Sequence, residues 1–146
     1  MDCKIMPMTI EHFDKIKNIL SDKFDSFWTT SILNEELQNP SSQYFAALHD
    51  DEIVGFGGIW KAVDDCHITD IVVRKDCRML GIGSLILEKL IQVAKQTNLG
   101  SITLEVNVNN VPAQRLYEKY GFKSLGVRKK YYNNIDDAII MTLYFE

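Results

Sequence analysis

The hydrophobic and polar positions change their period along the chain, and each change predicts a different element. Between residues 101 and 108 apolar and polar side chains alternate, which is the pattern of a strand with one buried face. From Gly81 to Gly100 the apolar residues recur at three- and four-residue spacing, which predicts an amphipathic helix closed by a glycine. Because residues 67–73 predict a strand before this helix, the segment predicts two parallel strands joined by a helical crossover.

The first 60 residues carry weaker patterns of the same two kinds. An opening strand is predicted over residues 3–8, and Thr9 can cap a helix that runs to Leu20. A second helix is predicted from about Thr30 to the residue before Pro40. The alternating runs 44–48 and 53–60 then predict an antiparallel pair, the second strand loosened by glycines.

After the crossover the chain predicts one more helix and two strands. The helix begins after Asn109 or Asn110 and ends before Gly121. The strands cover residues 122–127 and 138–144, with a polar connection between them. The complete order predicts a single α/β domain over residues 1–146: a mixed sheet of about seven strands with a parallel centre, and about four helices on both faces.

Composition and charge narrow the class of protein. The chain has 146 residues, of which 46% are hydrophobic and 25% charged, as expected for one globular domain. Its three cysteines have no metal-binding or disulfide-framework spacing, so we expect no metal and a reducing cytoplasm. The net charge of −4 argues against general nucleic-acid binding. No signal segment or long apolar run indicates secretion or a membrane.

Two glycines, Gly81 and Gly83, lie at the start of the predicted central helix. Backbone N–H groups at such a helix start favour an anion, with phosphate or pyrophosphate as the usual ligand. A nucleoside-triphosphate loop needs a lysine after its last glycine, and a dinucleotide loop needs a third glycine where Ile86 stands. The remaining interpretations are a pyrophosphate loop of another kind and a tight turn without a ligand.

After the strand Ile71-Val72-Val73, the segment Arg78-Met79-Leu80-Gly81-Ile82-Gly83 has the pattern R-x-x-G-x-G. It resembles the acetyl-coenzyme A loop of the GNAT superfamily of N-acetyltransferases, whose order of elements also matches. Downstream, Leu104-Glu105-Val106, Asn110 to Ala113, Leu116 to Phe122, Arg128 to Tyr132 and Asp136 to Met141 resemble the ribosomal-protein-alanine N-acetyltransferases. The chain departs from that family's pattern at Asn107, where arginine is usual.

The resemblance implies a site for acetyl-coenzyme A as the co-substrate. The backbone of Ile71, Val72 and Val73 would pair with the pantetheine arm. Arg78 would add positive charge beside the pyrophosphate, and Asn110 and Tyr117 would lie along the pantetheine. The residues whose amides would hold the pyrophosphate are Met79, Leu80, Gly81, Ile82, Gly83 and Ser84. A plain helix cap explains Asn110 equally well.

Two residues are candidates for the chemistry of acetyl transfer. Glu105 is the candidate general base, because it is a carboxylate in the middle of a strand that a doubly covered sheet should bury. By resemblance, Tyr117 is the candidate general acid beside the coenzyme sulfur, with an ordinary pKa near 10. The alternatives are a solvated glutamate and a core tyrosine. By resemblance, four aromatic residues would wall the acceptor groove: Phe27, Trp28, Tyr131 and Tyr132.

The function implied by the resemblance is acetylation of the N-terminal α-amine of a protein, with an alanine of a basic ribosomal protein as the expected acceptor and partner. An α-amine with a pKa near 7.8 loses its proton more easily than a lysine near 10.4, a difference of about 3.5 kcal/mol. One alternative is an acetyltransferase of small amines such as polyamines, amino acids or drugs. Another is a non-catalytic acyl-coenzyme A sensor, although a sensor needs neither Glu105 nor Tyr117.

Overall fold

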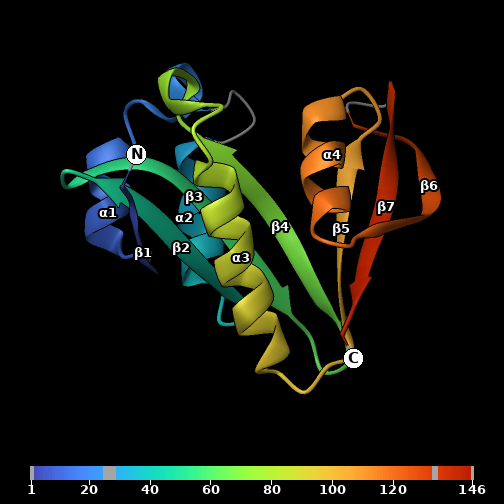
Figure 1. Ribbon diagram of the computed structural model, residues 1–146. Coiled ribbons are helices and arrows are strands. Elements are labelled where there is room, and N and C mark those ends of the chain that lie inside the picture. Colours follow the sequence, from blue (N-terminus) through green and yellow to red (C-terminus); the bar gives the residue numbers. More distant parts are fainter. Residues whose placement is uncertain (1, 25–28, 133–134, 146) are drawn as a thin grey trace.

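The computed structural model describes residues 2–24, 29–132 and 135–145, and its centre is a seven-stranded mixed sheet (Figure 1). The strands are β1 (Lys4–Pro7), β2 (Ser42–His49), β3 (Glu52–Lys61), β4 (Cys66–Val73), β5 (Ser101–Asn107), β6 (Lys123–Tyr132) and β7 (Asp136–Tyr144). Across the sheet they follow the order β1-β2-β3-β4-β5-β7-β6. The helices are α1 (Ile10–Ile16), α2 (Thr30–Gln38), α3 (Ile82–Lys95) and α4 (Val111–Lys119). A π-helical segment, Leu20–Phe24, and a 3-10 turn, Lys75–Cys77, complete the described elements. The predicted fold class is confirmed.

The sheet changes direction at its centre, between β4 and β5. These two strands pair in parallel and α3 connects them, as the sequence predicts, whereas the other described strand pairs are antiparallel. Their ladder is confined to one residue pair, His67 with Thr103. Toward their C-terminal ends the two ribbons diverge (Figure 1). The backbone pairing of the sheet is therefore interrupted between residues 68–73 of β4 and 104–107 of β5.

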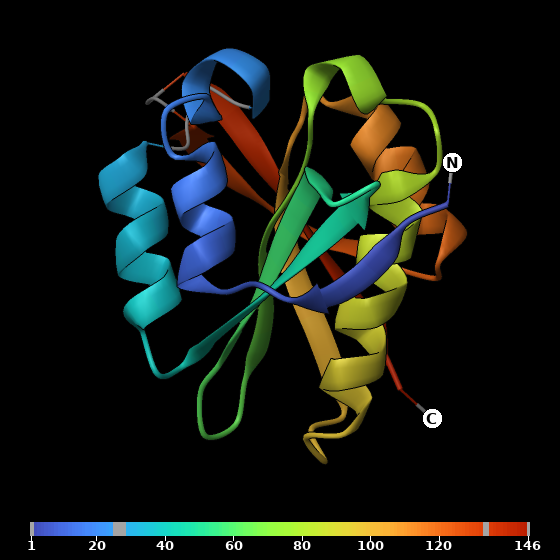
Figure 2. The same ribbon diagram turned by 90° about the vertical axis from the view of Figure 1, so that its left-hand side faces the viewer.

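Helices cover both faces of the sheet, α1 and α2 on one side and α3 and α4 on the other (Figure 2). On the α1 and α2 side, Tyr44 and Val72 belong to one buried cluster. On the α3 and α4 side, Ile86, Leu104 and Tyr117 belong to a second. Strands β2, β3 and β4 contribute to both clusters because successive side chains point to opposite faces. No helix among the described residues is long and apolar enough to cross a bilayer.

Strand β3 contains three glycines and nevertheless continues over ten residues. The sequence predicts a loosened strand here, and the structure shows a closely packed one. A Cβ atom at Gly57 would lie 2.6 Å from Cγ2 of Ile86 in α3, which is closer than a real side chain allows. The missing side chain therefore lets α3 lie close against the sheet, which fixes the start of α3 relative to β4.

The helix starts follow the predicted caps. The Thr9 hydroxyl accepts a hydrogen bond from the His12 N–H at 3.3 Å, and the Asn110 side chain accepts one from the Ala113 N–H at 3.2 Å. Helix α1 is shorter than predicted, because it ends at Ile16 and the chain then forms the π-helical segment. Leu20 is still buried in the cluster beneath α1 and α2. The apolar spacing that extends to Leu20 therefore indicates a buried position and not a longer α-helix.

The C-terminal hairpin is longer than the sequence predicts. Residues 128–132, predicted as a polar connection, continue β6 as far as Tyr132. The pairing with β7 shifts between Arg128 and Tyr132, where Lys130 has a φ of 51°. Its N–H donates to the carboxylate of Asp137 at 2.8 Å and lowers the pKa of that group. A bulge thus carries charged residues within a strand, and Arg128 pairs with Ala138 of β7 just before it.

Candidate active site

The loop between β4 and α3 has the geometry of an anion site at a helix start. Met79 and Gly81 have φ values of 66° and 83°, in the left-handed region that turns the chain sharply. Gly81 is the N-cap of α3, so no side chain caps this helix, and a Cβ atom built on Gly81 meets nothing within 4 Å. Because the first N–H groups of a helix have no partner within it, the amides of Ile82, Gly83 and Ser84 are available to a ligand.

Arg78 holds the loop in place. Its Nε donates to the Val73 carbonyl at 3.3 Å, and its Nη2 donates to the Phe24 carbonyl at 3.1 Å. The side chain therefore ties the loop to the end of β4 and to the π-helical segment. The resemblance implied only a positive charge near the pyrophosphate, and these two carbonyl contacts were not predicted.

The C-terminal half of β4 presents backbone groups toward the interrupted side of the sheet. The Arg74 N–H donates to the Val54 carbonyl at 2.8 Å, which fixes the alternation of the antiparallel ladder. Val72 consequently turns its backbone groups toward β3, while Ile71 and Val73 turn theirs toward β5. The Ile71 N–H already contacts the Asp70 carboxylate at 2.8 Å. Of the three residues predicted to pair with pantetheine, Ile71 and Val73 thus lie on the open side.

Glu105 lies on β5 with its side chain on the face opposite to Leu104 and Val106, and it is 20% exposed. Nη1 of Arg128 contacts both carboxylate oxygens, at 2.9 and 3.1 Å. The Arg128 guanidinium carbon also lies 4.4 Å from the ring centre of Tyr131. Glu105 is therefore a held, mostly buried carboxylate rather than a freely solvated one, and Arg128 links it to a residue predicted to wall the acceptor groove.

Tyr117 is 8% exposed on α4 and belongs to the buried cluster that includes Leu104 and Val106. Its ring meets the edge of Phe122 at a centroid distance of 5.7 Å. The core position that its spacing indicates is thus observed. Because Leu104 and Val106 point toward Tyr117, Glu105 points to the other face of β5. The structure places the two candidate catalytic side chains on opposite sides of the strand that borders the interruption.

The structure describes only some of the remaining residues that were predicted for the site. Asn110 is exposed and caps α4, and Tyr131 is exposed on β6. Phe27 and Trp28 lie outside the described residues, and only the backbone of Tyr132 is described. Of the four residues predicted to wall the acceptor groove, only Tyr131 therefore has a described side chain, and it lies beside Arg128. The sequence pattern does not indicate this position of Arg128, because the register shift between Ser124 and Gly126 decides which face of β6 the side chain occupies.

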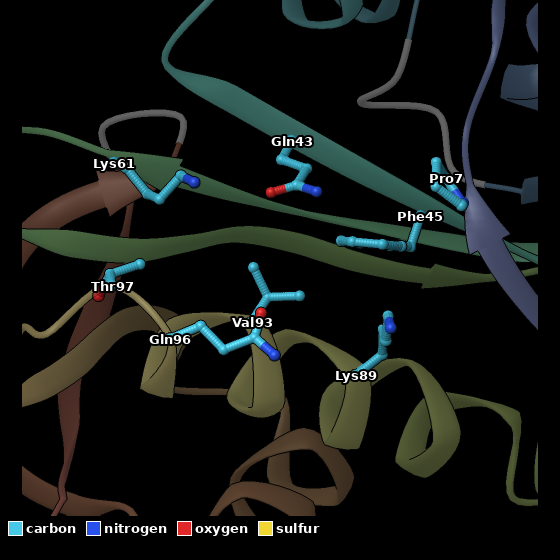
Figure 3. A pocket seen from close by; sticks show the side chains of 8 residues that line it. All are labelled: Pro7, Gln43, Phe45, Lys61, Lys89, Val93, Gln96 and Thr97. Carbon is cyan, nitrogen blue, oxygen red and sulfur yellow. The ribbon is translucent and has the colours of Figure 1, made fainter.

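Two surface hollows in the described part of the chain lie elsewhere. One, of about 660 Å³, is formed by Pro7, Gln43, Phe45, Lys61, Lys89, Val93, Gln96 and Thr97 (Figure 3). The other, of about 780 Å³, involves Lys95, Asn98, Tyr120 and Tyr144. Neither contains a residue predicted for the site. We therefore define the candidate site by its loop amides and open strand edge, because these groups fit a pyrophosphate and an extended amide chain.

Comparison with known proteins tests the resemblance. The model of the Acetyltransferase (GNAT) family matches residues 13–122. A Bacillus subtilis (strain 168) protein, provisionally named a ribosomal protein bS18-alanine N-acetyltransferase, is 36% identical over 136 residues, which cover 92% of this chain and 90% of that protein. The resemblance to ribosomal-protein-alanine N-acetyltransferases is confirmed at this level.

Solved structures agree on the fold. The Escherichia coli ribosomal-protein-S18-alanine N-acetyltransferase superposes with a TM-score of 0.88 at 24% identity, covering 99% of this chain and 95% of that one. A provisionally assigned streptothricin acetyltransferase from Bacillus anthracis str. Ames, solved with acetyl coenzyme A, has a TM-score of 0.68 at 34% identity, covering 77% and 67%. This chain belongs to the GNAT acetyltransferase family and is an acetyl-coenzyme A-dependent N-acetyltransferase.

Proposed function

We propose that this enzyme acetylates the N-terminal α-amine of a protein, and that an alanine at the start of a ribosomal protein is its acceptor. The position of Glu105 carries the proposal. A carboxylate that is 20% exposed, oriented by an arginine and next to the interrupted ladder, suits the removal of one proton from an amine. The relative named for bS18-alanine acetylation supports the choice of acceptor.

Each candidate residue has one task in this proposal. The loop amides of residues 79–84 hold the pyrophosphate, and Ile71 and Val73 offer backbone groups to the pantetheine arm. Acetyl-coenzyme A supplies the acetyl thioester when it is bound. The acceptor nitrogen bonds to the acetyl carbon as the carbon–sulfur bond breaks, Glu105 takes the proton from that nitrogen, and Tyr117 gives its phenolic proton to the sulfur.

The opposite positions of Glu105 and Tyr117 suit this division of tasks. A proton must leave the acceptor on one side of the reacting carbon and reach the sulfur on the other. Glu105 on one face of β5 and Tyr117 of α4 on the other can serve the two sides only where the pairing of the sheet is interrupted, and the ladder between β4 and β5 is confined to His67 with Thr103. The proposed acceptor and the free cysteines Cys3, Cys66 and Cys77 favour the cytoplasm as the place of the reaction.

Acetylation of a small amine or drug is the second candidate function, because a streptothricin acetyltransferase is 34% identical over 77% of this chain. A panel of acceptors separates the two. Peptides that begin with alanine, serine, methionine or proline, the same peptides with a blocked α-amine, spermidine and streptothricin would each be incubated with acetyl-coenzyme A and analysed by mass spectrometry. The proposal predicts fastest turnover on the alanine peptide and none on its blocked form. Turnover confined to the small amines would overturn it.

A further inference from the structure

Arg128 crosses the sheet to reach the candidate base. It stands on the edge strand β6, Glu105 stands on β5, and β7 lies between these two strands. Its partner on β7 is Ala138, a buried residue with only a methyl side chain. A larger residue at Ala138 would occupy the surface of β7 that the arginine side chain must cross. The small residue therefore leaves a path from β6 to the carboxylate.

The guanidinium group is held on two sides. One side donates from Nη1 to both oxygens of Glu105, at 2.9 and 3.1 Å. The other side faces the ring of Tyr131 at 4.4 Å, in the geometry of a cation–π contact. Arginine stays charged at every pH at which proteins are folded, and its planar group keeps a fixed orientation between two such partners. The carboxylate of Glu105 is thereby fixed as well.

We propose that Arg128 is a positioning residue for acetyl transfer: it orients the Glu105 carboxylate toward the acceptor amine and connects that orientation to Tyr131 beside the acceptor. The inference rests on the proposed function, since it takes Glu105 as the base. Arg128 need not touch the acceptor or acetyl-coenzyme A. It acts through Glu105, so its removal lowers the rate of the proton transfer and leaves coenzyme binding unchanged.

A neighbouring ion pair supplies the matched control. Lys129 on the same strand contacts Asp137 at 3.4 Å, and its side chain is more exposed than that of Arg128. Both basic side chains are more than half exposed, at 55% for Arg128 and 81% for Lys129, so neither substitution should unfold the protein. Arg128→Gln removes the charge that holds Glu105, Arg128→Lys keeps a charge of similar reach, and Lys129→Gln removes a charge that does not contact Glu105.

The test measures kcat and KM for both substrates, with the melting temperature of each variant. We expect Arg128→Gln to lower kcat about 10- to 100-fold while KM for acetyl-coenzyme A stays within about twofold. Arg128→Lys should recover part of the loss, and Lys129→Gln should match the unsubstituted enzyme. In a Glu105→Gln background, adding Arg128→Gln should lower kcat no further, because both substitutions disable one unit.

Three results would overturn the inference: an unchanged kcat in Arg128→Gln, an equal loss in Lys129→Gln, or a full additional loss in the Glu105→Gln background. Failure of the proposed function is a separate outcome. If the unsubstituted enzyme acetylates only small amines, the same variants are compared on the best small amine, and the ratio of their kcat values still tests whether Arg128 positions Glu105.

Discussion

Glu105 and Tyr117 lie on opposite faces of β5. Tyr117 packs with the apolar side of this strand, while Glu105 extends from its polar side to Arg128. The strand borders the central interruption of the sheet. Substitutions on the two faces should therefore differ in their effects on turnover, coenzyme binding and stability. Each of these effects can be measured separately.

Replacing Glu105 with glutamine should abolish most turnover and leave the fold intact. Glutamine keeps the size of the side chain but cannot accept the proton from the amine, so kcat should fall by about 10²- to 10⁴-fold. The dissociation constant for acetyl-coenzyme A, measured by calorimetry, should not change. Glu118→Gln, on the exposed side of α4, is the control and should retain full activity. Full activity in Glu105→Gln would refute its role as the base.

Replacing Tyr117 with phenylalanine should lower kcat while preserving the aromatic core. The ring can still meet Phe122, so we expect the free energy of unfolding to fall by no more than about 1 kcal/mol. The activity loss should exceed the effect of Tyr120→Phe, since Tyr120 is a partly buried tyrosine at the C-cap of the same helix. If the two variants were equally active, Tyr117 would be only a core residue.

Replacing Gly81 with alanine tests the loop. The new methyl group meets no atom within 4 Å, so its cost comes from the φ of 83°, about 1 kcal/mol of unfolding free energy. Strain at the N-cap should also displace the amides of residues 82–84 and raise the KM for acetyl-coenzyme A. Gly100→Ala is the control, since its site is equally open and its φ is outside the left-handed region. Equal stability and KM in both variants would contradict this account of the loop.

Tyr44 predicts a loss of stability at alkaline pH. Burial raises the pKa of its phenol, whose hydroxyl pairs with the Thr69 hydroxyl at 2.8 Å. The folded state therefore keeps the proton when the unfolded state, with a pKa near 10, has lost it. Its contribution is complete below pH 10 and declines above it, by about 1.4 kcal/mol per pH unit.

Urea unfolding from pH 8 to pH 11 checks this prediction when the chain is compared with Tyr44→Phe. The phenylalanine variant keeps the ring in the core and removes only the titrating hydroxyl. The difference in unfolding free energy between the two proteins should stay constant up to about pH 10 and then change in favour of the variant. If the difference in unfolding free energy stays constant up to pH 11, titration of Tyr44 does not cause the loss of stability at alkaline pH.

Features set by local sequence were predictable. The crossover from β4 through α3 to β5 follows from a strand pattern, a helical pattern and a second strand pattern in series, and the caps at Thr9 and Asn110 depend on residues three positions apart. The left-handed turn at Gly81 is likewise indicated by its glycine.

Features set by contacts between distant segments were not predictable. Arg78 reaches the carbonyl of Phe24, 54 residues away, and Arg128 reaches Glu105 across β7. Neither contact follows from a periodicity, because the first joins a loop to the π-helical segment and the second depends on the register of β6 and β5 against β7. Near Lys130 the pairing shifts in register within a run of charged residues. The sequence pattern there therefore does not indicate that strand β6 continues.

The most direct test offers the enzyme a choice within one molecule. A peptide that begins with alanine and carries a free lysine in its interior would be incubated with acetyl-coenzyme A, and fragment-ion mass spectrometry would locate the added acetyl group. We expect acetylation of the α-amine, with the lysine unmodified and with the product absent for Glu105→Gln. Acetylation of the lysine, or of neither amine while spermidine or streptothricin is acetylated, would contradict it.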